Sequence, residues 1–218
     1  MNMPEVEEHF KKEAVVFIHG IWLTGIEMTL MRHRVAICGY ECHQFSYKSL
    51  SRTPRENAQA LNNYLATLDS EVIHLVAHSL GGIVVMHLFN DFPQQKPGRV
   101  VLLGSPINGS RVAKHISQTS LLRGFLGHSV NQGLLGDVPQ WKSEHDIGMI
   151  AGTKGIGLGT VFAPRALEKP NDGTVSLSAT QSDAIKEHRT VAYSHQGMLL
   201  ATSVAKLVCH FLKKGQFK

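Results

Sequence analysis

Six short runs of mostly apolar residues, separated by segments of helical length, constrain the fold of this chain more than any other feature. Continuous apolar runs of this length are typical of strands that are buried on both faces of a sheet. Strands that alternate with helices predict an α/β fold with a mostly parallel six-stranded sheet and helices on both faces. The strands are expected at 14–20, 41–47, 72–78, 99–106, 147–153 and 188–194, and the helices at about 27–37, 54–68, 79–92 and 196–212.

The helix expected at 54–68 has the clearest start signal. Thr53 is a candidate N-cap, Pro54 occupies the first helical position, and Glu56 follows the cap by three residues. A capping threonine and a glutamate at this spacing can satisfy two backbone donors reciprocally. The sequence therefore predicts a capping box.

The length of the chain favours one domain with an insertion. A chain of 218 residues with 43% hydrophobic composition can bury one substantial core. Residues 107–146 contain leucine-rich patches without a strand pattern, and residues 154–171 contain glycines and two prolines. Long irregular segments in compact domains often serve as lids or binding loops. We expect a single domain over residues 1–218 with a cap insertion at about 107–146.

Charge and cysteine content limit the class of protein. The formal net charge is +5, but the basic residues are scattered along the sequence. We therefore expect no nucleic-acid binding and at most a weak association with an anionic membrane surface. The chain has three cysteines, Cys38, Cys42 and Cys209, an odd number without CxxC spacing. We therefore expect them to be core-filling thiols in a reducing compartment. The first residues are polar and acidic, unlike a secretory signal, and no run has the roughly 18 apolar residues of a membrane span. These features predict a cytoplasmic protein.

The stretch AHSLGG, residues 77–82, joins an expected strand to an expected helix through small residues. A tight strand–turn–helix connection would lift the Ser79 hydroxyl above the carboxyl edge of the sheet, where open α/β folds bind ligands. Ser79 could instead serve only as the N-cap of the helix. Because Ala77 stands where a nucleophile elbow usually has glycine, this stretch alone leaves both interpretations open.

A nucleophilic serine needs a histidine base and an orienting carboxylate. His195 lies in the loop after the last expected strand and is the predicted base, whereas the other downstream histidines are expected to be structural. Asp172, in an Asn-Asp-Gly turn, is the predicted acid, with an ordinary surface turn as the alternative. Asp146 is the rival carboxylate, but it opens a strand at the amino edge of the sheet.

The transition state of acyl transfer also needs donors for the oxyanion. The backbone N–H of Leu80 follows the nucleophile, and the N–H of Ile21 lies in the loop after the first expected strand. His19 is expected to fix that loop. His78 is expected to point away from the site and to serve as a packing or supporting residue.

Five motifs together resemble the α/β-hydrolases, and among them the small bacterial lipases and esterases. In chain order they are VVFIHGIW, LVAHSLGGIV, LLGSPINGS, NDGTVS and SHQGML, and they span roughly residues 14–212. The resemblance implies a triad of Ser79, Asp172 and His195, with Ile21 and Leu80 as oxyanion donors. Asn108 stands where many relatives carry a histidine, which affects substrate detail rather than the chemistry.

The expected activity is hydrolysis of a small-molecule carboxylic ester, with an apolar acyl group, through an acyl-enzyme. Trp22, Leu121, Leu122 and Phe125 are candidate substrate-binding residues, although the leucines of the insertion could equally belong to the core. An acyltransferase or thioesterase could use the same triad, and a binding protein could keep this fold without catalysis.

No cofactor or metal is expected. The glycine-rich GIGLG stretch lacks the spacing of a phosphate-binding loop, and the 13 histidines form no cluster with ligand spacing. The oligomeric state is not predicted.

Overall fold

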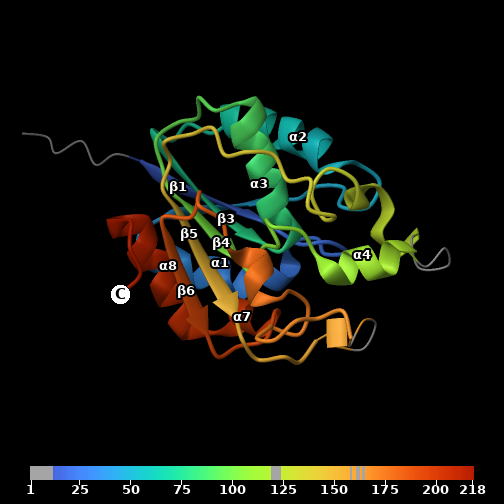
Figure 1. Cartoon of the computed structure of the whole chain (residues 1–218). Coiled ribbons are helices and arrows are strands. Elements are labelled where there is room, and N and C mark those ends of the chain that lie inside the picture. Colours follow the sequence, from blue (N-terminus) through green and yellow to red (C-terminus); the bar gives the residue numbers. More distant parts are fainter. Residues whose placement is uncertain (1–11, 119–123, 158, 161–162, 164) are drawn as a thin grey trace, which may run out of the picture.

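The computed structural model describes residues 12–118, 124–157, 159–160, 163 and 165–218 (Figure 1). Its centre is a six-stranded sheet in the order β2-β1-β3-β4-β5-β6, in which every neighbouring pair is parallel. This arrangement confirms the predicted fold class. The strands are β1 (Glu13–Ile18), β2 (Glu41–Phe45), β3 (Val72–His78), β4 (Val100–Leu103), β5 (Ile147–Gly152) and β6 (Glu187–Val191).

Helices cover both faces of the sheet (Figure 1). They are α1 (Thr29–Ala36), α2 (Pro54–Ala66), α3 (Leu80–Asp91), α4 (Arg111–Gln118), α7 (Gly197–Leu200) and α8 (Thr202–Lys214), with 3-10 turns η1 (Ile26–Met28), η2 (Gly124–Val130) and η3 (Leu177–Thr180). The helix expected at 196–212 is therefore two helices, because Ala201 has an extended backbone (φ −85°, ψ 124°).

Side chains that alternate along β3 divide the core into two layers. Leu75 and Ala77 pack with α2 and α3 on one face, whereas Val76 packs with α1, α7 and α8 on the other. Both layers are apolar and buried, as the continuous hydrophobic runs predict for a parallel sheet. β3 is thus held from both sides, which fixes the position of the residue that follows it.

The start of α2 confirms the predicted capping box. The Thr53 hydroxyl accepts a hydrogen bond from the Glu56 N–H (3.3 Å), and the Glu56 carboxylate accepts one from the Thr53 N–H (2.7 Å). This reciprocal pair satisfies donors that the first helical turn would otherwise leave open.

The insertion at 107–146 contains α4 and η2 in its described part. Its apolar side chains form a cluster with Leu80 and Ile83 at the start of α3. Leu126 and Leu134 are buried members of this cluster. The start of α3 is therefore covered by an apolar layer to which both this segment and Ala163 and Leu167 contribute.

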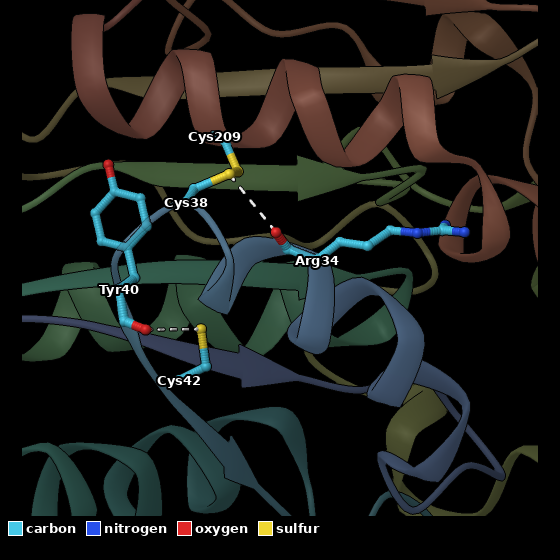
Figure 2. The surroundings of a disulfide bond; sticks show 5 residues. All are labelled: Arg34, Cys38, Tyr40, Cys42 and Cys209. Atoms are coloured by element: carbon cyan, nitrogen blue, oxygen red, sulfur yellow. Dashed lines mark hydrogen bonds between the residues drawn. A yellow bond between two sulfur atoms is a disulfide. The ribbon is translucent and has the colours of Figure 1, made fainter.

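The cysteines correct one expectation. Cys38, just after α1, forms a disulfide with Cys209 of α8, across a sequence separation of 171 residues (Figure 2). Only Cys42 is a free thiol, and burial raises its pKa to about 11. The prediction of free thiols is wrong for Cys38 and Cys209, because the fold brings two distant helices into contact.

Within the described residues, we find no helix that has both the length and the apolar character needed to cross a membrane.

The disulfide should contribute measurably to stability. Cys38→Ser is expected to lower the free energy of unfolding by about 2–5 kcal/mol, because the bond closes a long loop in the unfolded chain. Urea unfolding followed by circular dichroism, with and without reductant, measures this loss. Cys42→Ser is the matched control. If reductant did not change the urea midpoint of the parent protein, the disulfide would contribute nothing to the free energy of unfolding.

Candidate active site

Ser79 occupies a strained turn between β3 and α3. Its backbone has φ 53° and ψ −121°, a region that residues other than glycine rarely adopt. Its N–H donates a hydrogen bond to the Leu103 carbonyl oxygen at the end of β4 (2.9 Å). Ser79 stands at the N-cap position of α3, but its side chain makes no capping hydrogen bond. The geometry therefore matches a nucleophile elbow and does not support a purely capping role.

The glycines after Ser79 are required by close packing. A Cβ atom on Gly81 would lie 2.5 Å from the Ile18 carbonyl oxygen and 2.7 Å from that of His19. Only a residue without a side chain lets the first turn of α3 approach the end of β1 so closely. This approach brings the Leu80 amide beside the loop that leaves β1.

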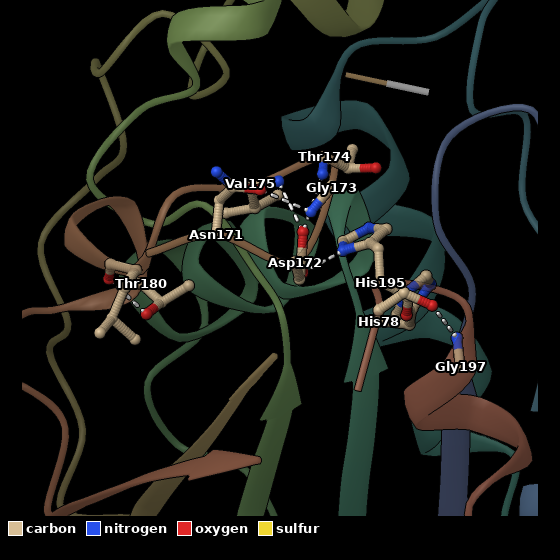
Figure 3. Close-up of polar contacts among 11 residues, drawn as sticks. His78, Asn171, Asp172, Gly173, Thr174, Val175, Thr180, His195 and Gly197 are labelled. Atoms are coloured by element: carbon tan, nitrogen blue, oxygen red, sulfur yellow. Dashed lines mark hydrogen bonds and ion pairs between the residues drawn. The ribbon is translucent and has the colours of Figure 1, made fainter. Parts of the chain in front are cut away.

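Asp172 and His195 form a buried pair. His195 Nδ1 lies 2.6 Å from Asp172 Oδ2, and the His195 N–H donates to the Asp172 carbonyl oxygen (2.8 Å). The exposed fractions are 1% for Asp172 and 3% for His195. A carboxylate oxygen can only accept, so Nδ1 carries the proton and Nε2 presents its lone pair. Figure 3 shows the two side chains directed at one another.

The other oxygen of Asp172 is held by its own loop. Oδ1 accepts hydrogen bonds from the backbone N–H groups of Thr174 (2.9 Å) and Val175 (2.7 Å) (Figure 3). Both carboxylate oxygens of Asp172 are hydrogen-bonded and the residue is buried, so it does not belong to an ordinary surface turn. The rival Asp146 lies at the start of β5 and pairs with Lys186 (2.8 Å) and Arg99 (3.7 Å).

Gly104 marks the point where the Ser79 turn meets the acid–histidine pair. It follows Leu103, the residue that accepts from the Ser79 N–H, and it has φ +56°. A Cβ atom here would lie 3.0 Å from both Asp172 Oδ2 and His195 Nδ1. The three predicted triad residues therefore gather at the carboxyl end of β3 and β4.

No hydrogen bond joins the Ser79 hydroxyl to His195 in the part of the chain that the structure describes. Such contacts are often long in catalytic sites and tighten only in the substrate complex. The proton relay between these two residues stays a prediction.

The predicted oxyanion donors flank Ser79. Leu80 is the first residue of α3, where a backbone N–H has no partner within the helix. Ile21 follows Gly20, and a Cβ atom on Gly20 would touch the Ser79 Cβ at 3.2 Å. In the described residues, neither amide donates to another protein group. Both N–H groups are free to bind an anion, although their role stays a prediction.

His19 fixes the Ile21 loop, as expected from the sequence. Its Nδ1–H donates to the Gly20 carbonyl oxygen (2.8 Å), and its Nε2 accepts from the Tyr47 N–H (3.2 Å). The Tyr47 hydroxyl donates to the His19 carbonyl oxygen (2.8 Å), and the two rings stack with centroids 4.2 Å apart. Burial lowers the pKa of His19, which keeps this arrangement neutral.

His78 lies closer to the site than the sequence indicated. Its side chain leaves β3 on the side of α7 and α8, but the loop that carries His195 passes over that side. His78 Nε2 lies 3.3 Å from the His195 carbonyl oxygen. The expectation that His78 points away from the site is wrong, because strand alternation alone does not show that the His195 loop covers this side of β3.

The candidate substrate-binding residues are only partly placed. Trp22, next to Ile21, has φ 62° and an exposed fraction of 40%. Leu121 and Leu122 lie outside the described residues, as does the side chain of Phe125. Among the residues that are described, no three His, Cys, Asp or Glu side chains are grouped so that they could hold a metal ion.

A family model described as "Domain of unknown function (DUF7379)" matches residues 3–151. No curated protein sequence matches this chain.

Three solved structures illustrate what the chain resembles. The mature lipase BlEst2 of Bacillus licheniformis is similar with a TM-score of 0.69 and 18% identity, over 90% of each chain. The metagenomic carboxyl esterase MGS0156 has a TM-score of 0.58 and 14% identity, over 85% of this chain and 65% of that one. The bromoperoxidase of Bacillus anthracis has a TM-score of 0.60 and 14% identity, over 94% and 92%. These likenesses show the α/β-hydrolase fold, as the motifs predict, and identities this low show nothing further.

Replacing Gly104 should break the acid–histidine pair. Gly104→Ala forces a side chain against Asp172 and His195 and strains a left-handed backbone, which costs about 1–3 kcal/mol. We expect the far-downfield proton NMR signal of the Asp172–His195 hydrogen bond to weaken or disappear. Gly39→Ala is the matched control, because Gly39 also has a positive φ (+98°) but its Cβ would meet nothing within 4 Å. An unchanged signal in Gly104→Ala would contradict the described geometry.

Proposed function

The chain belongs to the family described as a domain of unknown function (DUF7379), and we propose that it is a serine hydrolase that cleaves carboxylic esters. One observation carries the proposal: the buried Asp172–His195 pair lies beside the strained turn that presents Ser79. A carboxylate, an oriented imidazole and an elbow serine in this chain order are the components of acyl transfer through a covalent intermediate.

The first half of the reaction forms an acyl-enzyme. Ser79 Oγ attacks the ester carbonyl carbon while His195 Nε2 takes the hydroxyl proton. The tetrahedral intermediate then collapses, the bond from carbon to the alkoxy oxygen breaks, and Nε2–H gives its proton to the departing alcohol. In the second half, water hydrolyses the acyl-enzyme by the same steps. It loses a proton to His195 and attacks the acyl carbon, and the bond to Ser79 Oγ then breaks as His195 returns the proton to the serine.

Asp172 supports both halves through His195. Its Oδ2 accepts from Nδ1, which fixes the tautomer whose Nε2 can accept a proton, and its charge stabilises the imidazolium that then forms. The negative charge that develops on the substrate oxygen is accepted by the Ile21 and Leu80 amides. The N-terminal end of α3 adds a favourable field at the same point.

An apolar acyl group is the proposed substrate feature. Leu80 and Ile21 belong to an apolar cluster that also contains Leu126 and Leu134 of the insertion. The two donor residues of the proposed oxyanion site therefore border a buried apolar cluster, and we propose that the edge of this cluster forms an apolar surface that favours hydrocarbon over polar acyl chains. We propose that the segment 107–146 acts as a cap, and that Trp22 contributes to the same surface. The similarity to the lipase BlEst2 and the carboxyl esterase MGS0156 supports this choice of substrate class.

The cellular compartment is a separate proposal. Disulfides persist in oxidising compartments and are rare in the cytosol, so the Cys38–Cys209 bond favours a non-reducing location over the cytoplasmic one expected from the sequence. Thiol counting in freshly lysed cells decides between the two. One free thiol per chain supports a non-reducing location, and three support the cytoplasm.

Loss of the nucleophile should abolish activity. Ser79→Ala is expected to lose hydrolysis of p-nitrophenyl esters and covalent labelling by a fluorophosphonate while it keeps the circular dichroism spectrum of the parent. Ser182→Ala, which removes an exposed hydroxyl, is the control. Labelling that persists in Ser79→Ala at another serine would overturn the assignment. An ester series of graded chain length tests the apolar preference, and product analysis with added alcohols or thioesters separates hydrolysis from acyl transfer.

Asp172→Asn tests the choice of acid. An amide cannot hold the productive tautomer, so kcat should fall by about a thousandfold to ten-thousandfold with KM little changed. Asp146→Asn is the matched control, because Asp146 is the rival carboxylate at the opposite edge of the sheet. A large loss in Asp146→Asn with activity retained in Asp172→Asn would exchange the two roles.

A further inference from the structure

The side chain of His78 fills the space between the two halves of the proposed site. It is fully buried, and its ring centroid lies 4.5 Å from that of His195, with the ring planes tilted by 43°. On its other side lies the Ile21 loop, because a Cβ atom on Gly20 would come within 3.2 Å of His78 Nδ1. His78 therefore contacts the loop of the proposed base and lies against the loop of the proposed oxyanion donor.

One hydrogen bond fixes the tautomer of the His78 ring. Nε2 lies 3.3 Å from the His195 carbonyl oxygen, which can only accept, so Nε2 carries the proton. Nδ1 is buried and has no partner among the described residues. Burial and the nearby His195 hold the pKa of His78 well below its ordinary value. The ring is thus a neutral donor that adds no charge next to His195.

Residue 195 is held by contacts at three points. Asp172 supplies two of them, through the His195 ring and the His195 N–H. The third is the His195 carbonyl group, which faces His78. Without this third contact, residue 195 could turn about the axis through the two Asp172 bonds. A displacement of the base of about 1 Å can reduce the rate of a proton transfer strongly.

We propose that His78 is a positioning residue, which holds the main chain of His195 so that Nε2 is aimed at the Ser79 hydroxyl. This inference rests on the proposed function, because it assigns the residue next to the nucleophile a part in aiming the base. His78 does not touch the reacting atoms. It acts through the backbone of His195, and its neutrality leaves the imidazolium of His195 as the only cation that forms beside it during the reaction.

Two substitutions separate the hydrogen bond from simple filling of space. His78→Phe keeps a ring against His195 but removes the donor, whereas His78→Gln keeps an N–H near the position of Nε2. We expect His78→Phe to lower kcat about five- to tenfold, the effect of one lost hydrogen bond of this kind, with KM within about twofold of the parent. His78→Gln should restore most of the rate.

Titration with fluorophosphonate distinguishes positioning from damage to the fold. If His78 positions His195, His78→Phe should label Ser79 to the same final stoichiometry as the parent but at a rate lower by the same factor as kcat. A purely structural role would instead lower the labelled fraction and leave the rate per labelled site unchanged. A rate per labelled site in His78→Phe that equals the rate of the parent would therefore overturn the proposal.

His87→Phe is the matched control. His87 is also buried, and its Nε2 lies 2.6 Å from the backbone oxygen of Gln132 in the segment 107–146, but it sits further along α3 and, within the described residues, has no hydrogen bond to Ser79, Asp172 or His195. The same substitution there removes the same kind of bond. We expect it to lower stability without changing the rate per labelled site.

A second measurement needs no catalysis. The His195 Nδ1 proton, identified by its loss in Asp172→Asn, should exchange with water about five- to tenfold faster in His78→Phe, and at the parent rate in His78→Gln and His87→Phe. If the parent protein neither hydrolyses esters nor labels, the proposed function fails, and this exchange rate still tests whether His78 holds residue 195. Unchanged exchange in His78→Phe would refute the positioning role.

Discussion

The close approach of the first turn of α3 to the end of β1 is the constraint on which the rest of the site depends. Gly81 lies against the carbonyl groups of Ile18 and His19, with no space for a Cβ atom. This contact holds Ser79 in its unusual backbone conformation, and it places the Leu80 amide beside the loop that contains Ile21. Strain at one residue is maintained because two packed elements leave no alternative path for the chain.

A network of buried polar groups surrounds this turn and limits where charge can reside. His19 and His78 are held neutral by burial, and each donates one hydrogen bond to a backbone carbonyl. Asp172 has both carboxylate oxygens bonded. Most buried polar groups are paired, and each of these bonds also fixes a loop. The same interactions that satisfy these groups therefore also align the loop of the proposed oxyanion donor, the proposed acid and the proposed base.

Three apolar clusters support the site: one on each face of the sheet and one over the start of α3. α2 and α3 pack on one face and α1 with α8 on the other, which holds β3 in place. The insertion adds a third cluster over the start of α3. The disulfide ties α1 to α8 on the face opposite α3, so it stabilises the support of the site without contacting Ser79. Structures with this fold carry names as different as lipase and bromoperoxidase, so the function must be argued from the site.

The sequence by itself determined the six strands, the parallel sheet and most of the helices, because hydrophobic periodicity and capping signals act over a few neighbouring residues. It did not indicate α4 or the break at Ala201 between α7 and α8. It also indicated Ser79, Asp172 and His195, since each follows a strand or lies in a turn with its own local pattern. Only the tertiary structure decided that Cys38 meets Cys209 and that His78 lies beneath His195. These contacts join residues 171 and 117 positions apart, and local patterns carry no information about which distant segments pack together.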